Sequence, residues 1–194
     1  MQKFSFKKMF KTMAHIKVAD DIPGIRSLAL FRPETGKPLY ALVQVLLRGP
    51  SPLTIAEREL MAAYVSKKNN CTFCFESHAA AARCLYGHAA FIVNEVVDDL
   101  VSASISRKFK TLLLIAGKVQ ESGTAVKQVD IDAAKNEGAS DKEIHDTVLI
   151  AAVFSMFNRY VDGLATFTPT DPATYKEMGN RMVKGYELKT NQAS

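Results

Sequence analysis

The chain has 194 residues, of which 47% are hydrophobic and 23% charged. This ordinary globular composition excludes a disordered or fibrous protein, and no apolar run approaches the roughly 20 residues of a membrane span. The formal net charge of +5 comes from the first 17 residues, which carry five lysines and no acid. The remaining body has 20 basic and 20 acidic residues, which argues against a surface built throughout to bind nucleic acid.

The basic arm has an amphipathic pattern of its own. Its apolar residues Phe6, Met9, Phe10 and Met13 recur at helical spacing between the lysines. Such a helix can lie on an anionic membrane, or the arm can pack on its own or a neighbouring subunit, which we favour. We therefore expect an arm over residues 1–19 and a single all-helical domain over residues 20–194.

The body reads almost entirely as helix, and strand signals are weak. Thr54 with Glu57, and Ser140 with Glu143, form two capping boxes that open helices. Pro38 suits a first turn, and Asp130 is expected to cap a short helix. In chain order, the predicted helices cover residues 35–48, 54–68, 71–85, 91–100, 107–119, 130–138, 140–160 and 175–185.

A faint internal similarity relates the segment around Glu59 to the segment around Lys110. Each segment reads as a turn, a charged cluster and then an apolar helix. Aligning these two residues puts Ser122, Ala125 and Val129 opposite Cys71, Cys74 and His78. Either the chain contains a degenerate duplication whose second copy lost its polar chemistry, or the two helices are unrelated.

The informative constellation is a glutamate, two cysteines and a histidine, in the pattern E-x11-C-x2-C-x3-H from Glu59 to His78. If a helix opens at Cys71, then Cys71, Cys74 and His78 share one face, at i, i+3 and i+7. Two thiols at this spacing can form a disulfide, and a helix N-terminus stabilises a thiolate. His78 beside Cys74 can take its proton.

Helix geometry places Glu59 as well. In an antiparallel hairpin that turns at Asn69 and Asn70, Glu59 lies about 15 Å from the turn and His78 about 10 Å. Side chains or one water can bridge that difference of about one helical turn. The predicted order is therefore Glu59, His78, Cys74 and Cys71, with Glu59 orienting His78.

Two alternatives to redox chemistry remain. Cys71, Cys74 and His78 could hold zinc with Glu59, Cys84 or His88 as a fourth ligand, although no second C-x-x-C or H-x-x-H accompanies them. Chance buried cysteines are the other alternative, and we expect Cys84 itself to be core. The odd count of three cysteines and the missing apolar signal-peptide region favour a cytoplasmic protein without a disulfide framework.

The pattern L-T-x-x-E-R-E-L ahead of N-N-C-T-F-C-F-E-S-H resembles the carboxymuconolactone decarboxylase superfamily. It is most similar to the alkylhydroperoxidase D-like branch, and especially to its peroxidase-related subgroup. Ile22-Pro23-Gly24, Phe157-Asn158-Arg159 and Gly185-Tyr186 extend the resemblance over residues 20–186. The C-x-x-C pair argues against lactone decarboxylation, because the decarboxylase branch lacks it.

The resemblance implies an all-α subunit that assembles into trimers or hexamers and reduces hydroperoxides with a thiol or dithiol donor in antioxidant defence, without a cofactor or metal. It implies that Cys74 is the peroxidatic thiol, that Cys71 resolves it to a disulfide, and that Glu59 and His78 relay protons. The best-studied branch has a histidine between the cysteines, where this chain has Phe73. That departure keeps a redox sensor or scaffold without efficient turnover as an alternative.

Overall fold

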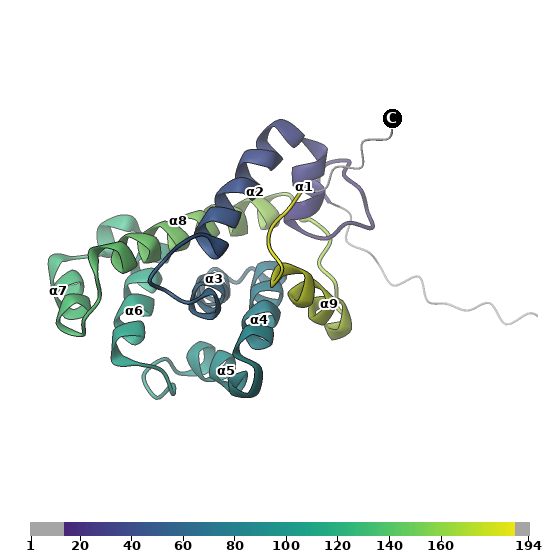
Figure 1. Ribbon diagram of the computed structural model, residues 1–194. Coiled ribbons are helices and arrows are strands. Elements are labelled where there is room, and N and C mark those ends of the chain that lie inside the picture. Colours follow the sequence, from purple (N-terminus) through teal and green to yellow (C-terminus); the bar gives the residue numbers. More distant parts are fainter. Residues whose placement is uncertain (1–13, 189–194) are drawn as a thin grey trace, which may run out of the picture.

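The computed structural model describes residues 14–188, and all regular structure within that range is helical (Figure 1). The all-α fold expected from the sequence is therefore confirmed. The α-helices are α1 (Ile25–Phe31), α2 (Pro33–Arg48), α3 (Ile55–Lys68), α4 (Thr72–Tyr86), α5 (Phe91–Asp98), α6 (Arg107–Glu121), α7 (Gln128–Asn136), α8 (Asp141–Gly163) and α9 (Pro172–Met182), with short 3-10 turns η1 (Gly87–Ala89) and η2 (Gly123–Ala125).

Both predicted capping boxes are present. The Thr54 hydroxyl accepts from the Glu57 backbone N–H at 3.2 Å, and the Glu57 carboxylate accepts from the Thr54 N–H at 2.8 Å. Ser140 and Glu143 make the same reciprocal pair at the start of α8, at 3.2 and 2.7 Å. These bonds satisfy N–H groups that a helix N-terminus otherwise leaves free, which is why α3 and α8 begin where the sequence predicts.

Several predicted boundaries are wrong. Helix α1 was not predicted, and α2 begins at Pro33, so Pro38 lies inside the helix instead of in its first turn. Pro33 itself occupies the N-terminal position that suits proline. Asp130 is the third residue of α7 rather than its N-cap residue, but its carboxylate caps the helix as expected by accepting from the Lys127 N–H at 2.9 Å. Helix α9 begins earlier than predicted, at Pro172.

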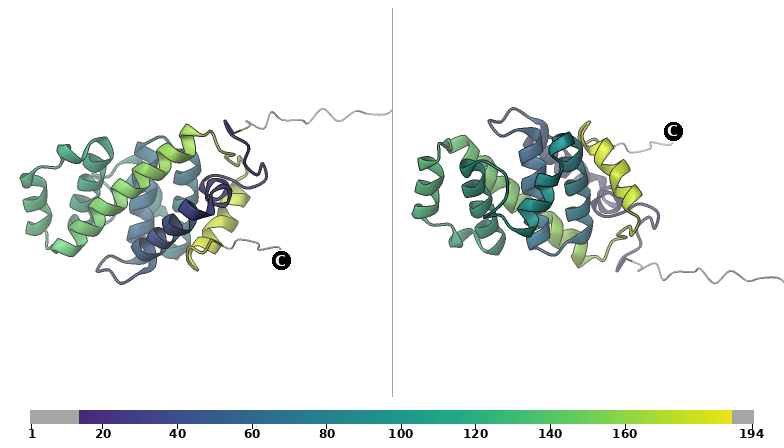
Figure 2. Two further views of the ribbon diagram at one scale, coloured as in Figure 1. Left: turned by 90° about the horizontal axis from the view of Figure 1, so that it is seen from above. Right: turned by 90° about the horizontal axis from the view of Figure 1, so that it is seen from below.

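Helix α3 is the centre of the packing. It contacts α4, α6 and α8, and the residues from Leu60 to Ala63 are fully buried. Helix α8 runs along much of the molecule, with α7 near its first residues and α1 near its last (Figure 1, Figure 2). Helix α9 packs on α4. The molecule therefore has one end formed by α6, α7 and the start of α8, and another formed by α1, α2, α4 and α9.

The two segments that share the internal similarity differ after their first helix. Helices α3 and α6 align, but the position of α4 in the first segment corresponds to η2 and the short α7 in the second. Whether a duplication produced them stays a prediction.

The apolar pattern of the arm, from Phe6 to Met13, lies outside the described residues. Among the helices of residues 14–188, none has the length and apolar character of a membrane span.

Candidate active site

The hairpin of α3 and α4 brings Glu59 and His78 together. Asn70 adopts a left-handed conformation (φ 59°) between the helices, and the Cys71 N–H donates to the Ser66 carbonyl at 3.0 Å. Asparagine tolerates this conformation better than most residues. The returning helix places His78 Nδ1 2.7 Å from Glu59 Oε2, as the helix arithmetic predicts.

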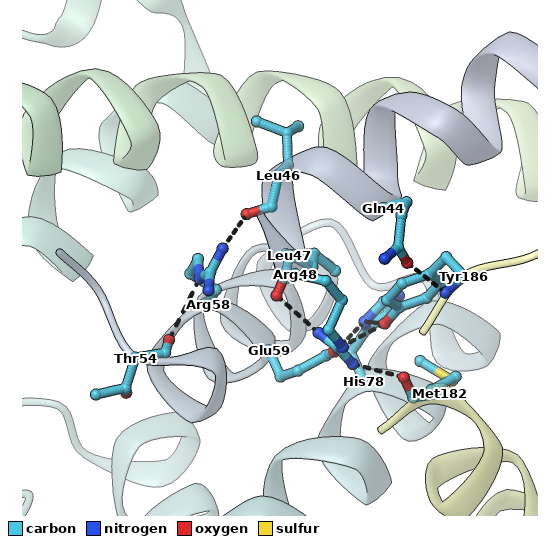
Figure 3. Close-up of polar contacts among 10 residues, drawn as sticks. All are labelled: Gln44, Leu46, Leu47, Arg48, Thr54, Arg58, Glu59, His78, Met182 and Tyr186. Atoms are coloured by element: carbon cyan, nitrogen blue, oxygen red, sulfur yellow. Dashed lines mark hydrogen bonds and ion pairs between the residues drawn. The ribbon is translucent and has the colours of Figure 1, made fainter. Parts of the chain in front are cut away.

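Glu59 is fully buried and is bound by three side chains from three other segments (Figure 3). His78 contacts Oε2, whereas Oε1 receives Arg48 Nη2 at 2.6 Å and the Tyr186 hydroxyl at 2.5 Å. Arg48 ends α2, and Tyr186 lies in the segment after α9. Together these contacts hold one carboxylate at the meeting point of α2, α3, α4 and the C-terminal segment.

The partners of Glu59 keep it ionised. Burial alone raises the pKa of a carboxyl group, but the charge and hydrogen bond of His78, the charge of Arg48 and the hydrogen bond from Tyr186 together outweigh it, so the pKa of Glu59 is lowered. An ionised carboxylate only accepts hydrogen bonds, so His78 donates through Nδ1. In the neutral imidazole, Nε2 is then the proton acceptor, and it has no hydrogen-bond partner within residues 14–188.

Arg48 and Tyr186 are site residues that the sequence reasoning missed. Burial and the nearby Glu59 carboxylate raise the pKa of Tyr186 well above its ordinary value, so its hydroxyl stays a donor. Arg48 also donates to the Met182 carbonyl at 2.6 Å and lies over the Tyr186 ring. The Tyr186 N–H donates to Gln44 Oε1 at 2.7 Å, which fixes the segment on α2.

The two cysteines lie at the start of α4. Cys71 is the N-cap residue, so Cys74 occupies the first turn, where free N–H groups and the helix dipole favour negative charge. The neighbouring Cys74 side chain and burial both raise the pKa of Cys71. The Cys71 thiol therefore keeps its proton at neutral pH.

A pocket of about 710 Å³ opens in front of Cys74, with Ser77 and His78 on the same wall. Cys71 does not line it and is fully buried. One link of the predicted order is not direct: in the described part of the chain no hydrogen bond joins His78 to Cys74, although both face this pocket. A substrate or water in the pocket is needed to connect them.

Phe73, which stands where the best-studied branch has histidine, lines the same pocket as Cys74 and His78. It is 6% exposed and lies against Gly24, with the Tyr175 ring 6.5 Å away between centroids. A Cβ on Gly24 would come within 1.8 Å of the Phe73 ring, and Gly24 has φ +55°. Only glycine fits there, which gives a physical role to one residue of the Ile22-Pro23-Gly24 segment.

The expectation that Cys84 is a core residue is wrong. Its side chain is exposed and donates to Asn180 Oδ1 at 3.4 Å. Ten residues after Cys74, it lies about 80° away around the helix, where α4 meets the edge of α9. Within the described residues, no three His, Cys, Asp or Glu side chains gather closely enough to hold a metal ion, so that range supplies no ligand set of the kind that the zinc alternative needs.

Solved structures with this fold share the resemblance seen in the sequence. An uncharacterized peroxidase-related protein from Silicibacter sp. TM1040 superposes with a TM-score of 0.71 at 25% identity, over 80% of this chain and 79% of its own. Another from Ralstonia eutropha JMP134, described as an alkylhydroperoxidase AhpD core, gives 0.72 at 24% identity, over 81% of each chain. No family model and no curated protein matches the chain. The resemblance to the alkylhydroperoxidase D-like branch is thus confirmed by structures similar to this one.

Proposed function

We propose that this chain, which has the alkylhydroperoxidase D-like fold, is a thiol-dependent peroxidase with Cys74 as the peroxidatic thiol. The observation that carries the proposal is that Cys74 lines the pocket, with the fully buried Cys71 three residues before it and His78 about one turn further along the same wall. The peroxidase-related names of the similar solved structures support the general class of activity.

In the proposed reaction, the Cys74 sulfur attacks the terminal oxygen of a hydroperoxide. The sulfur–oxygen bond forms as the oxygen–oxygen bond breaks, which yields a sulfenic acid and an alcohol. His78 Nε2 takes the thiol proton through a molecule in the pocket and returns it to the leaving alkoxide. Glu59 holds the imidazole in the required tautomer and stabilises its charged form.

Cys71 then resolves the sulfenic acid. Its sulfur attacks the Cys74 sulfur, a disulfide forms and water leaves with the thiol proton. An external thiol or dithiol supplies the two electrons that reduce the disulfide again. The placement of the two cysteines supports this step, because Cys71 is the N-cap of α4 and Cys74 lies in its first turn, three residues later.

Counting thiols tests the proposal. Hydrogen peroxide or cumene hydroperoxide should remove two of the three thiols of the reduced protein and join Cys71 to Cys74. The Cys84→Ser variant is the matched control, and it should lose both of its remaining thiols. Reduced protein that keeps all its thiols under these conditions would overturn the proposal.

The sensor or scaffold alternative is favoured by one observation, the Phe73 side chain packed where the related branch has a histidine. Both hypotheses predict the disulfide, but only the enzyme predicts turnover. Steady-state peroxide consumption with several thiol and dithiol reductants separates them: turnover supports the peroxidase, and a single stoichiometric oxidation supports the sensor.

The homo-oligomer implied by the resemblance stays a prediction. Several apolar side chains of α1 and α2 are exposed, namely Phe31, Leu42 and Val45. Light scattering on the eluted protein should give a trimer or hexamer mass, and a monomer mass at micromolar concentration would contradict it.

A further inference from the structure

The pocket in front of Cys74 combines an apolar wall with two guanidinium groups. Arg26 enters it from α1 and Arg181 from α9. Across residues 14–188, neither guanidinium forms an ion pair or a hydrogen bond. Apolar side chains cover much of the remaining wall, among them Ile22, Ile25, Val43, Phe154, Phe157 and Met178.

Tyr40, on α2, lines the same pocket as Arg26 and Arg181, and the charges of both arginines act on its phenol. Burial raises the pKa of Tyr40 to about 12 although Arg26 and Arg181 each lower it. The phenol therefore keeps its proton at neutral pH, and the described part of the chain offers it no acceptor. The guanidinium groups of Arg26 and Arg181 and the hydroxyl of Tyr40 are thus hydrogen-bond donors that have no acceptor among residues 14–188.

The acids that line the pocket do not neutralise these donors by contact. Asp21 and Glu187 are exposed and form no ion pair with either arginine among the described residues. Lys184, which is exposed, adds a third cation to the lining. The pocket lining therefore carries three cations, Arg26, Arg181 and Lys184, against two anions, Asp21 and Glu187.

We propose that the substrate is an organic hydroperoxide with an apolar body and an acidic group, a carboxylate or a phosphate, that Arg26, Arg181 and Tyr40 bind while the peroxide meets Cys74. This inference rests on the proposed function and names its substrate class. Guanidinium groups bind both anions through paired hydrogen bonds. A pocket of about 710 Å³ has the size of a site for a molecule much larger than hydrogen peroxide.

The test compares an acid with its ester. Linoleic acid hydroperoxide and its methyl ester, both below their micelle concentrations, are mixed with reduced protein, and the rate of Cys74 oxidation is followed in a single turnover. This readout does not depend on the electron donor. The acid should react about tenfold faster than the ester, the effect of one strong charged contact.

The double variant Arg26→Gln/Arg181→Gln should bring the acid-to-ester rate ratio close to one. Arg107→Gln, an exposed arginine at the start of α6 outside the pocket lining, removes a like charge and should keep the wild-type ratio. Dodecanoate and dodecyl phosphate as competitors show which anion binds more tightly. A wild-type ratio near one, or a ratio that the double variant leaves unchanged, would overturn the inference.

A separate outcome concerns the proposed function. If cumene hydroperoxide and both lipid hydroperoxides leave Cys74 reduced, the peroxidase proposal fails. The preference of the pocket for an acidic ligand is then tested by binding affinity alone. Calorimetry with the unreactive hydroxy acid and its methyl ester should then still give tighter binding of the acid, weakened in the double variant. Equal binding of acid and ester would contradict the inference on its own.

Discussion

Two buried glutamates, Glu143 at the start of α8 and Glu59 inside α3, use their carboxylates in different ways. Glu143, 3% exposed, accepts from the Ser140 N–H and hydroxyl at the start of α8 and from Lys108 on α6. Glu59, fully buried inside α3, binds no backbone group among residues 14–188 and receives hydrogen bonds from His78, Arg48 and Tyr186 instead.

This difference distinguishes a glutamate that stabilises a helix, Glu143, from one that we assign to catalysis, Glu59. Glu143 satisfies the N-terminus of its own helix, so its burial is explained by the capping it provides. Glu59 lies in the middle of a helix that does not need it, and a buried ion pair is weak evidence for stability. Perturbed groups beside a pocket are instead typical of functional sites, which is why Glu59 is the glutamate to which we assign the relay.

The largest expected effect is on activity. Glu59→Gln should lower the second-order rate of Cys74 oxidation by about 100-fold or more, because His78 loses the charge that orients and stabilises it. Glu143→Gln, the matched control, should stay within about twofold. Stopped-flow thiol oxidation measures both, and near-ultraviolet circular dichroism verifies the fold. Equal losses in the two variants would remove the distinction between the glutamates.

Stability should also separate the two glutamates. Glu59→Gln leaves the Arg48 charge buried without its counter-ion, which costs about 3–5 kcal/mol of unfolding free energy. Glu143→Gln weakens a cap and a half-exposed pair with Lys108, which costs about 1 kcal/mol. Urea denaturation gives both values, and a larger loss in Glu143→Gln would show that Glu59 is less tightly coupled to its partners than its contacts indicate.

Tyr186→Phe should have a smaller effect, a reduction of about tenfold in Cys74 oxidation, since Glu59 loses one of three donors. Tyr64→Phe removes a hydroxyl from α3 away from the pocket and should leave the rate unchanged. If both variants react alike, the Tyr186 hydroxyl does not contribute to the relay.

The smallest effect concerns acid stability. The pKa of Glu59 and of Glu143 is lowered by folding from an ordinary 4.5. The unfolded chain therefore binds these protons first, so stability is full above about pH 4.5 and is lost as pH falls through the folded pKa. Each glutamine variant should flatten this loss, which urea titrations between pH 3 and 6 measure. If neither variant changes the slope of unfolding free energy against pH, other titrating groups cause the loss of stability in acid.

Local signals made much of the fold predictable. The capping boxes at Thr54 and Ser140 lie within one helical turn, so sequence alone locates the starts of α3 and α8. The contact of Glu59 with His78 follows from one tight turn and the rise of a helix. The same reasoning fails at Pro38, because Pro33, five residues earlier, occupies the N-terminal position of α2.

Long-range packing made the rest of the site unpredictable. Tyr186 is 127 residues from Glu59 in sequence, and Arg48 comes from another helix. No motif spacing links them, because the packing of α2 and of the segment after α9 decides both contacts. Cys84 was misjudged because a free cysteine is usually buried, whereas its exposure depends on where α9 ends on α4.

Mapping the first oxidised thiol tests the assignment of Cys74 most directly. Reduced Cys71→Ser and Cys74→Ser proteins are treated with substoichiometric hydroperoxide, trapped with a sulfenic-acid reagent and mapped by mass spectrometry. We expect a trapped sulfenic acid at Cys74 in Cys71→Ser, and no oxidation at Cys71 in Cys74→Ser. Rapid oxidation of Cys71 in Cys74→Ser, with Cys74 unmodified in Cys71→Ser, would contradict the assignment.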